Sequence, residues 1–242
     1  MPSVTAYIDG LNLYHGLKEG GYENYRWVDP WLLCKHLCTK LSGKTQDKWD
    51  LQHVHYFYSD VRPIKGEASQ GRQDRYINAM QSHLGPARVQ FTKGKYTAAP
   101  LVCTNKSCDS SQQLHCPKCK RGIERRQEKR TDVAIAAAML TDCCAIASDR
   151  LLLITGDQDL VPAVSAAVEH HGKTVAVAVP PKRESVNLRN AANYYVRIGH
   201  DLKRSILPVP LMIPTSSGNE IRIDPPPGWV TRAISEKAAG TS

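Results

Sequence analysis

Apolar residues gather in short runs that have the length of β-strands. Residues 4–8, 151–154 and 174–179 show little alternation with polar residues, which is typical of strands buried on both faces of a parallel sheet. Residues 53–58 and 88–92 are rich in aromatic and β-branched side chains and predict two further strands. Helical patterns lie between these runs, so the sequence predicts an α/β fold. The expected helices cover residues 31–41, 72–83, 133–147, 162–171 and 185–195.

Two carboxylates follow the apolar run at residues 151–154. Gly156 permits a sharp turn there, Asp157 and Asp159 lie one residue apart in it, and Pro162 suits the first turn of the next helix. Open parallel sheets bind ligands at the carboxyl ends of their strands, where these acids are expected. For an isolated Asp-x-Asp, turn formation or helix capping explains the two acids as well as metal binding does. Support for a ligand site must therefore come from elsewhere in the chain.

Three more polar residues are expected at the same edge of the sheet. Asp9 closes the first strand and Asn12 follows in the turn to a helix. Asp132 lies in the first turn of helix 133–147, with Thr131 as the expected N-cap. That helix leads directly into strand 151–154, so its start is expected near the carboxyl end of this strand. The structural alternative for each residue is helix capping or interaction with the helix dipole.

The chain is basic, with 32 Lys and Arg against 23 Asp and Glu and a formal net charge of +9. The excess is concentrated: residues 118–130 contain seven cations against two acids, and residues 182–204 contain six against two. Such clusters indicate a polyanionic partner, because phosphate contacts supply most non-specific affinity for nucleic acids. The alternative is a solvated basic surface.

The eight cysteines fall into two groups. Cys34, Cys38, Cys143 and Cys144 lie in helical patterns and are expected to behave as small apolar core residues. The others form two pairs in a segment that breaks the α/β alternation, and they predict a structural Zn²⁺ site; they are Cys103, Cys108, Cys116 and Cys119. His115 could replace one thiolate, and a redox pair or unliganded thiols are the alternatives.

The domain organisation follows from these features. Residues 1–208 are expected to form one domain, with residues 96–130 as a cysteine-rich insertion. Residues 209–242 are rich in Pro, Gly and Ser and are expected to form an extended arm or tail. No stretch reaches the length of a membrane span, and residues 1–20 lack the order of a signal peptide. A cytoplasmic protein without membrane contact is therefore expected.

Four motifs in this order resemble the NYN family of PIN-like nucleases, in its bacterial branch. They are Tyr-Ile-Asp-Gly-Leu-Asn-Leu-Tyr-His-Gly at residues 7–16, Glu-Lys-Arg-Thr-Asp-Val at 128–133, Leu-Ile-Thr-Gly-Asp-Gln-Asp-Leu-Val-Pro at 153–162 and Leu-Arg-Asn-Ala-Ala at 188–192. The resemblance implies a three-layer α/β/α PIN-like fold with a mostly parallel central sheet, here with a small zinc-ribbon-like insertion. It also implies RNA cleavage dependent on Mg²⁺ or Mn²⁺. The implied catalytic residues are Asp9, Asn12, Asp132, Asp157 and Asp159, with the four aspartates as metal ligands.

The resemblance and the basic clusters together predict an endoribonuclease acting on single-stranded or loop RNA, either as a monomer or as a homodimer. Cations next to the motifs are the expected RNA contacts: Arg125, Arg126, Lys129, Arg130 and Arg189. Thr155 stands where the family usually has Ser. The family often carries a further acid in the helix after Asp132, and residues 134–138 offer none. The alternative is therefore a non-catalytic RNA-binding protein on the same fold.

Overall fold

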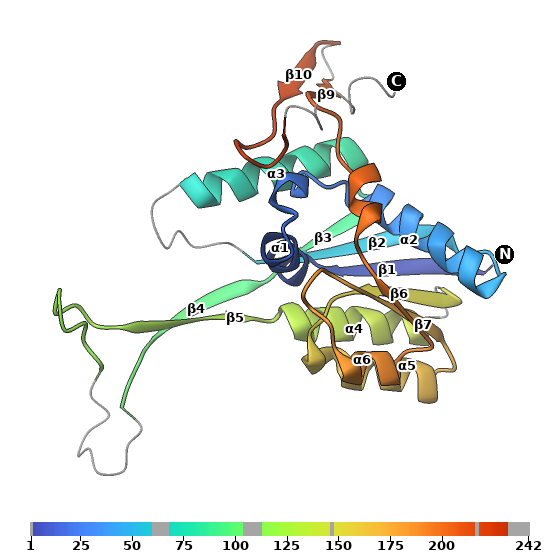
Figure 1. The fold of residues 1–242 in the computed structure, drawn as a ribbon, viewed down its shortest axis with the longest axis horizontal. Helices are drawn as coiled ribbons and strands as arrows, with labels where there is room; N and C mark the ends of the chain where they lie inside the picture. Colours follow the sequence, from blue (N-terminus) through green and yellow to red (C-terminus); the bar gives the residue numbers. More distant parts are fainter. Residues whose placement is uncertain (1, 60–67, 104–112, 146–147, 216–217, 232–242) are drawn as a thin grey trace.

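A six-stranded parallel sheet forms the centre of the protein (Figure 1). The computed structural model describes residues 2–59, 68–103, 113–145, 148–215 and 218–231. The strand order is β3-β2-β1-β6-β7-β8, so the direction of winding reverses between β1 and β6. The strands are β1 (Ser3–Asp9), β2 (Asp50–Tyr58), β3 (Val89–Lys93), β6 (Arg150–Ile154), β7 (Thr174–Val179) and β8 (Tyr194–Arg197).

Helices cover both faces of this sheet, which confirms the predicted three-layer α/β/α architecture (Figure 1). One face carries α1 (Gly10–Glu19), α2 (Pro30–Thr45) and α3 (Ala68–Leu84). The other carries α4 (Thr131–Cys144), α5 (Val161–Glu169) and α6 (Val186–Ala191). Short 3-10 turns complete the domain: η1 (Glu23–Tyr25), η2 (Gln158–Leu160) and η3 (His200–Arg204). None of the described helices has the length and apolar character needed to cross a membrane.

Burial on both faces explains the continuous apolar runs. In β1, Ala6 and Ile8 contribute to the core beneath α1, α2 and α3, whereas Tyr7 contributes to the core beneath α4 and α5. In β6, Leu152 and Leu153 divide between the two cores in the same way. Successive side chains of a strand point to opposite faces, so a strand covered on both sides needs apolar residues at every position.

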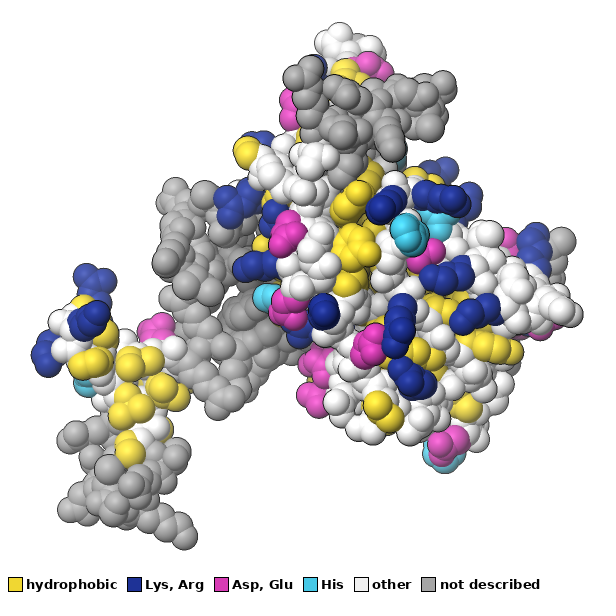
Figure 2. Space-filling view, in the orientation of Figure 1, with side chains coloured by type: hydrophobic (Ala, Val, Ile, Leu, Met, Phe, Trp, Pro, Cys, Tyr) yellow, Lys and Arg dark blue, Asp and Glu magenta, His cyan; other side chains and the backbone are white. Residues whose placement is uncertain are grey.

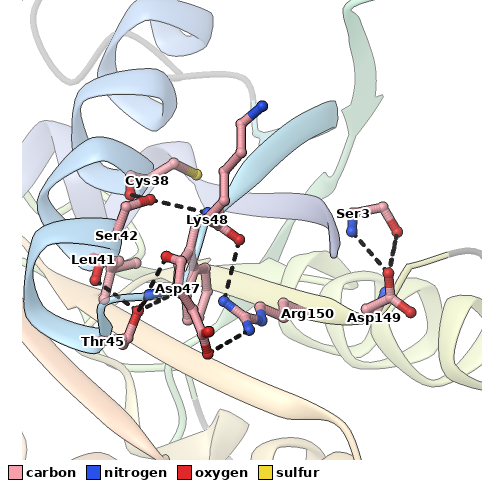
Figure 3. Close-up of polar contacts among 10 residues, drawn as sticks. Ser3, Cys38, Leu41, Ser42, Thr45, Asp47, Lys48, Asp149 and Arg150 are labelled. Atoms are coloured by element: carbon pink, nitrogen blue, oxygen red, sulfur yellow. Dashed lines mark hydrogen bonds and ion pairs between the residues drawn. The ribbon is translucent and has the colours of Figure 1, made fainter. Parts of the chain in front are cut away.

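Polar contacts hold the amino edge of the sheet, opposite the strand ends that carry the acids (Figure 3). The Arg150 guanidinium lies 2.9 Å from a carboxylate oxygen of Asp47 and also donates to the Lys48 carbonyl. The backbone N–H and the hydroxyl of Ser3 both donate to the Asp149 carboxylate. These contacts fix the starts of β1 and β6 relative to the end of α2.

Two of the expected local structures are wrong. Thr131 is not the N-cap of its helix: it is the first helical residue, and Arg130, with φ 84°, precedes it. The expected helix at 185–195 ends at Ala191, and β8 begins at Tyr194. Asn193 exchanges two hydrogen bonds with the Val175 backbone, which draws the following aromatic and β-branched residues into the sheet.

The insertion is a two-stranded antiparallel ribbon that extends away from the body (Figure 1). It consists of β4 (Lys95–Pro100) and β5 (Glu124–Lys129), and we call this ribbon, with residues 113–123 at its far end, the arm. The Gly94 N–H donates to the Tyr58 carbonyl, and β5 leads directly into α4. The arm therefore begins beside the carboxyl ends of β2 and β3.

The C-terminal segment folds back on the domain. Strands β9 (Leu211–Pro214) and β10 (Glu220–Ile223) form an antiparallel hairpin. Beyond it, Trp229 is only 5 % exposed and its ring packs against Tyr14 and Tyr76. Composition predicted an extended arm or tail here, and it gave no indication that one tryptophan returns to the core. Residues 232–242 lie outside the described part of the chain.

Candidate active site at the carboxyl edge of the sheet

Asp9 is a buried carboxylate, 4 % exposed, at the carboxyl end of β1. One oxygen, Oδ1, accepts from the Asn12 N–H at 3.0 Å and caps α1. The other, Oδ2, accepts from the Thr155 hydroxyl at 3.0 Å, across to the turn that follows β6. Helix capping therefore accounts for only one of the two carboxylate oxygens. The second oxygen joins two strand ends that are distant in the sequence.

One further hydrogen bond connects the two turns, and another lies within the turn after β6. The Gly156 N–H donates to the Asn12 side-chain oxygen at 2.9 Å, and the Asp157 N–H donates to the Thr155 hydroxyl at 3.1 Å. Thr155 is fully buried, so its hydroxyl is held between the Asp9 carboxylate and the Asp157 amide. The turns lie after β1 and β6, where the strand order reverses and doubly wound sheets place their ligands.

Gly156 is required by close packing. A Cβ atom at this position would lie 1.9 Å from the Arg183 carbonyl oxygen, so any side chain would displace the segment before α6. The same segment is fixed further along by the Asn187 amide, which donates to the Gln158 side chain at 2.7 Å. The turn after β6 is thus held from both sides, by α1 and by α6.

Asp157 and Asp159 lie nearer to solvent than Asp9. The Asp157 side chain accepts from the Asp159 N–H at 3.0 Å and caps η2, so the capping alternative applies here too. Asp157 is half-buried and Asp159 is exposed. One Asp157 oxygen is not used by this cap, and the Asp159 carboxylate lies at the surface of the same turn. Both side chains retain acceptor capacity for a ligand at the sheet edge.

Asp132 is half-buried in the first turn of α4, a helix that packs against η2. The preceding Thr131 is buried, and its hydroxyl lies 3.0 Å from that of Ser59 at the end of β2. Within the described residues, no group of three or more His, Cys, Asp or Glu side chains is arranged to hold a metal ion. A hydrogen bond thus links Asp9 to Asn12 directly, and the Thr155 hydroxyl links Asp9 to the Asp157 backbone, whereas an ion shared by Asp9, Asp132, Asp157 and Asp159 remains a prediction.

The donor set nevertheless fits a hard divalent cation. Carboxylate, amide and hydroxyl oxygens are the ligands that Mg²⁺ and Mn²⁺ prefer, and no sulfur or imidazole belongs to this group of residues. Asp9 is fixed by two hydrogen bonds, and Asp157 and Asp159 lie on the adjoining turn. One buried carboxylate with two carboxylates nearer to solvent is compatible with an ion that keeps part of its water shell.

The predicted RNA contacts lie in two places. Arg130 is exposed at the base of the arm, and Arg189 is exposed on α6 with its guanidinium 4.8 Å from the Tyr195 ring. The backbones of Arg125, Arg126 and Lys129 belong to β5, and their side chains lie outside the described part. Lys and Arg side chains also gather at the far end of the arm (Figure 2). Their role in RNA binding remains a prediction.

The second cysteine pair lies in a tight turn at the end of the arm. The Cys116 carbonyl accepts from the Lys120 N–H at 2.9 Å, and Lys120 has φ 58°. Hydrogen bonds from the backbone of Cys119 and Lys118 lower the pKa of the Cys116 thiol. Cys103 lies just before residues 104–112, and Cys108 falls within those residues, outside the described chain. The four-cysteine site therefore remains a prediction.

The other cysteines follow the expectation with one exception. Cys34, Cys38 and Cys143 are buried, and burial raises the pKa of each thiol, that of Cys38 to about 12. Cys144 is exposed, because it lies on the outer side of α4. The expectation that Cys144 belongs to the core is wrong.

The fold and site define an α/β domain in which the turns after β1 and β6 are hydrogen-bonded to each other where a doubly wound sheet reverses. The model of the NYN domain matches residues 4–199, so the chain belongs to the NYN domain family, part of the PIN-like nuclease superfamily. Over 207 residues the chain is 27% identical to 6-hydroxy-3-succinoylpyridine 3-monooxygenase HspA of Pseudomonas putida (strain DSM 28022 / S16). That match covers 80% of this chain and 64% of the relative, so the chain spans less than two thirds of its length.

Among solved structures, a protein of unknown function, VPA0982 from Vibrio parahaemolyticus RIMD 2210633, aligns with a TM-score of 0.44 and 16% identity. The alignment covers 83% of this chain and 94% of that chain.

The sequence did not reveal the role of Thr155 or Ser59. The sequence shows Thr155 only as a replacement for the Ser usual in the family, yet its hydroxyl joins the two acidic turns. Ser59 directly follows β2, and its hydroxyl pairs with that of Thr131, immediately before Asp132. Hydroxyl side chains directly after predicted parallel strands are the signal that could have identified both residues.

Proposed function

We propose that this chain is a ribonuclease that depends on Mg²⁺ or Mn²⁺ and cuts RNA internally. The observation that carries the proposal is the hydrogen-bonded junction of the two acidic turns at the reversal of the sheet. A buried Asp9 beside Asp157 concentrates negative charge at one edge, which a cation would neutralise. Membership in the NYN family supports the assignment of nuclease chemistry.

Each residue has a distinct part in this mechanism. Asp9, Asp132, Asp157 and Asp159 would hold the cation, which when bound supplies positive charge at the phosphate and activates water for attack. Asp9 keeps a fixed position because Asn12 and Thr155 donate to its two oxygens. The Asn12 side-chain oxygen is engaged by the Gly156 N–H, so its NH₂ group remains to orient water or a phosphate oxygen.

The charge distribution favours a nucleic acid as substrate, and membership in the NYN family favours RNA. The arm begins beside the acidic edge, with Arg130 exposed at its base and further cations toward its far end (Figure 2). An RNA strand lying along the arm would bring one phosphodiester to Asp9 and Asp157, while Lys and Arg side chains bind the neighbouring phosphates.

The proposal is tested by incubating the purified chain with mixed RNAs in Mn²⁺, in Mg²⁺ and in EDTA, and by mapping the new ends. Internal cuts in Mn²⁺ or Mg²⁺ that disappear in EDTA are expected. Salt-dependent RNA binding without cleavage in either metal would contradict it and favour the non-catalytic RNA-binding alternative.

The monooxygenase activity named for the Pseudomonas relative supplies a second measurement in the same experiment. Oxygen uptake is measured with 6-hydroxy-3-succinoylpyridine and NADH as the electron donor, alongside RNA hydrolysis, with the same protein preparation. We expect hydrolysis without substrate-dependent oxygen uptake. Uptake without hydrolysis would replace the ribonuclease proposal with an oxygenase.

We further propose that the arm holds one structural Zn²⁺ through Cys103, Cys108, Cys116 and Cys119. The lowered pKa of Cys116 and the tight turn around it suit a thiolate ligand. Atomic absorption is expected to find one zinc per chain, and Cys116→Ser and Cys119→Ser are each expected to lose it. Cys144→Ser, which removes an exposed thiol outside the arm, serves as the matched control. Retention of zinc in both arm variants would reject the site.

A further inference from the structure

A cavity of about 90 Å³ lies directly beside the acidic edge, between α1, α3 and the carboxyl end of β2. Two of its lining residues, Gly10 and Leu11, follow Asp9 immediately in the chain. A third, Ser59, is hydrogen-bonded to Thr131, the residue before Asp132. Residues that line the cavity therefore adjoin two of the four acids of the proposed active site, Asp9 and Asp132.

Aromatic side chains dominate the walls of this cavity. Five of the lining residues carry rings: Tyr14, Tyr56, Tyr58, Tyr76 and Trp229. The Trp229 ring lies 5.5 Å from that of Tyr76 and 6.4 Å from that of Tyr14. Tyr76 is fixed in turn, because its hydroxyl donates to the buried Val28 carbonyl at 2.7 Å. The rings thus form a rigid apolar enclosure suited to a flat ligand.

The charged groups around the cavity have one sign. Arg26 and Arg72 contribute to its lining, and no Asp or Glu does so within the described chain. The Arg26 guanidinium lies 5.2 Å from the Trp229 ring and is held by the carbonyls of Glu23 and Gly228. A ligand with both a flat ring and an anionic group matches this combination of aromatic walls and fixed cations.

We infer that this cavity binds the base of a nucleotide adjacent to the phosphodiester that is cut, which rests on the proposed ribonuclease function. A nucleobase supplies the flat heteroaromatic ring, and its phosphate supplies the anion. Proteins that bind single-stranded RNA commonly stack unpaired bases on aromatic side chains and Arg. The arrangement gives the enzyme a preference for an unpaired nucleotide, because a base inside a duplex cannot enter the cavity.

Binding of short oligonucleotides tests this inference independently of cleavage. The full chain is titrated in EDTA with a fluorescent single-stranded RNA and with versions in which one base at a time is removed to leave an abasic ribose. Loss of one particular base is expected to weaken binding by roughly 5- to 150-fold, the range measured for a stacked base. Removal of a base at any other position is expected to weaken binding less.

Variants identify the cavity as the place where that base binds. Ile77→Phe fills the cavity from α3 and is expected to abolish the sensitivity to the abasic position. Asn78→Phe, at the adjacent exposed position of the same helix, is the matched control and should retain it. Tyr14→Leu removes a ring but keeps apolar volume, and it provides a second variant if Ile77→Phe unfolds.

The outcomes separate this inference from the proposed function. Base sensitivity that survives both Ile77→Phe and Tyr14→Leu, or no sensitivity at any position, overturns the inference even if the protein cleaves RNA. Binding of 6-hydroxy-3-succinoylpyridine that both variants abolish, with unchanged RNA binding, also overturns it and assigns the cavity to a free heteroaromatic acid. An absence of cleavage in Mn²⁺ and Mg²⁺, together with base sensitivity that both variants abolish, overturns the ribonuclease proposal and supports the cavity as the base-binding site of a non-catalytic RNA-binding protein.

Discussion

Replacement of Asp157 by Asn is expected to lower Mn²⁺-dependent RNA cleavage by about 10²- to 10³-fold, the loss typical when one group stabilising transition-state charge is removed. The amide oxygen can still accept from the Asp159 N–H, as the carboxylate does at 3.0 Å, so the turn keeps its cap. Only the negative charge and one ligand oxygen are lost. Single-turnover cleavage and circular dichroism, measured on the same protein preparation, separate the loss of activity from loss of the fold.

The matched control for this prediction is Asp47→Asn. It makes the same chemical change at the opposite edge of the same sheet, where Asp47 pairs with Arg150 (Figure 3). That carboxylate is 63 % exposed, so its ion pair contributes less than about 1 kcal/mol to stability. Cleavage by this variant should equal that of the unmodified protein. Equal activity of the Asp157 and Asp47 variants would remove Asp157 from the active site.

Thermal unfolding offers a second measurement on the Asp157 variant. If Asp157 helps to bind Mn²⁺, the ion raises the midpoint of unfolding of the unmodified chain, because it binds the folded state preferentially. The rise should be smaller for Asp157→Asn and unchanged for Asp47→Asn.

The positions of the strands along the chain and the acidic turns could be predicted from sequence because each depends on local pattern. Strand 151–154 is covered on both faces, so it lacks polar alternation, and this apolar run is visible in the sequence. The pairing of Thr155 with Asp9 could not be predicted in this way. It joins residues 146 positions apart, and only the packing of β6 beside β1 brings them together.

The errors have related causes. The helix expected at 185–195 ends early because Asn193 bonds to the Val175 backbone, a contact with a different strand. The Pro, Gly and Ser content of the C-terminal segment predicts an extended arm or tail. Composition does not indicate that Trp229 packs against Tyr14 and Tyr76. In both cases tertiary contacts override the local tendency of the chain.

Helix capping and ligand binding are not competing explanations for these aspartates. Each carboxylate has two oxygens, and in Asp9 one caps α1 while the other reaches the β6 turn. Capping fixes the orientation of the carboxylate, which is the condition for binding an ion in a defined position. An aspartate that caps a helix at the carboxyl edge of a sheet is therefore already positioned to bind an ion there.

Thr155 tests that connection directly, because its hydroxyl supports Asp9 and Asp157 without belonging to the proposed metal ligands. Thr155→Val keeps the shape of the side chain and removes the hydroxyl. The Asp9 carboxylate then loses a donor in a buried site and the Asp157 N–H loses its acceptor, at an expected cost of about 1–3 kcal/mol in stability. Groups that orient metal ligands typically account for about 10- to 100-fold in affinity or activity, and we expect a loss of this size in both Mn²⁺ affinity and cleavage.

Thr155→Ser provides the decisive comparison. It restores the hydroxyl and omits only a methyl group, so the bonds to Asp9 and from Asp157 can form again. If Thr155 acts by positioning, Ser should recover Mn²⁺ affinity and cleavage almost completely, even though its smaller side chain leaves some packing stability unrecovered. If it serves only as packing in the core, the Val variant should match or exceed the Ser variant in both stability and activity. That ranking would show that the junction of the two turns does not organise the acidic edge, and the argument for a metal at this position would fail with it.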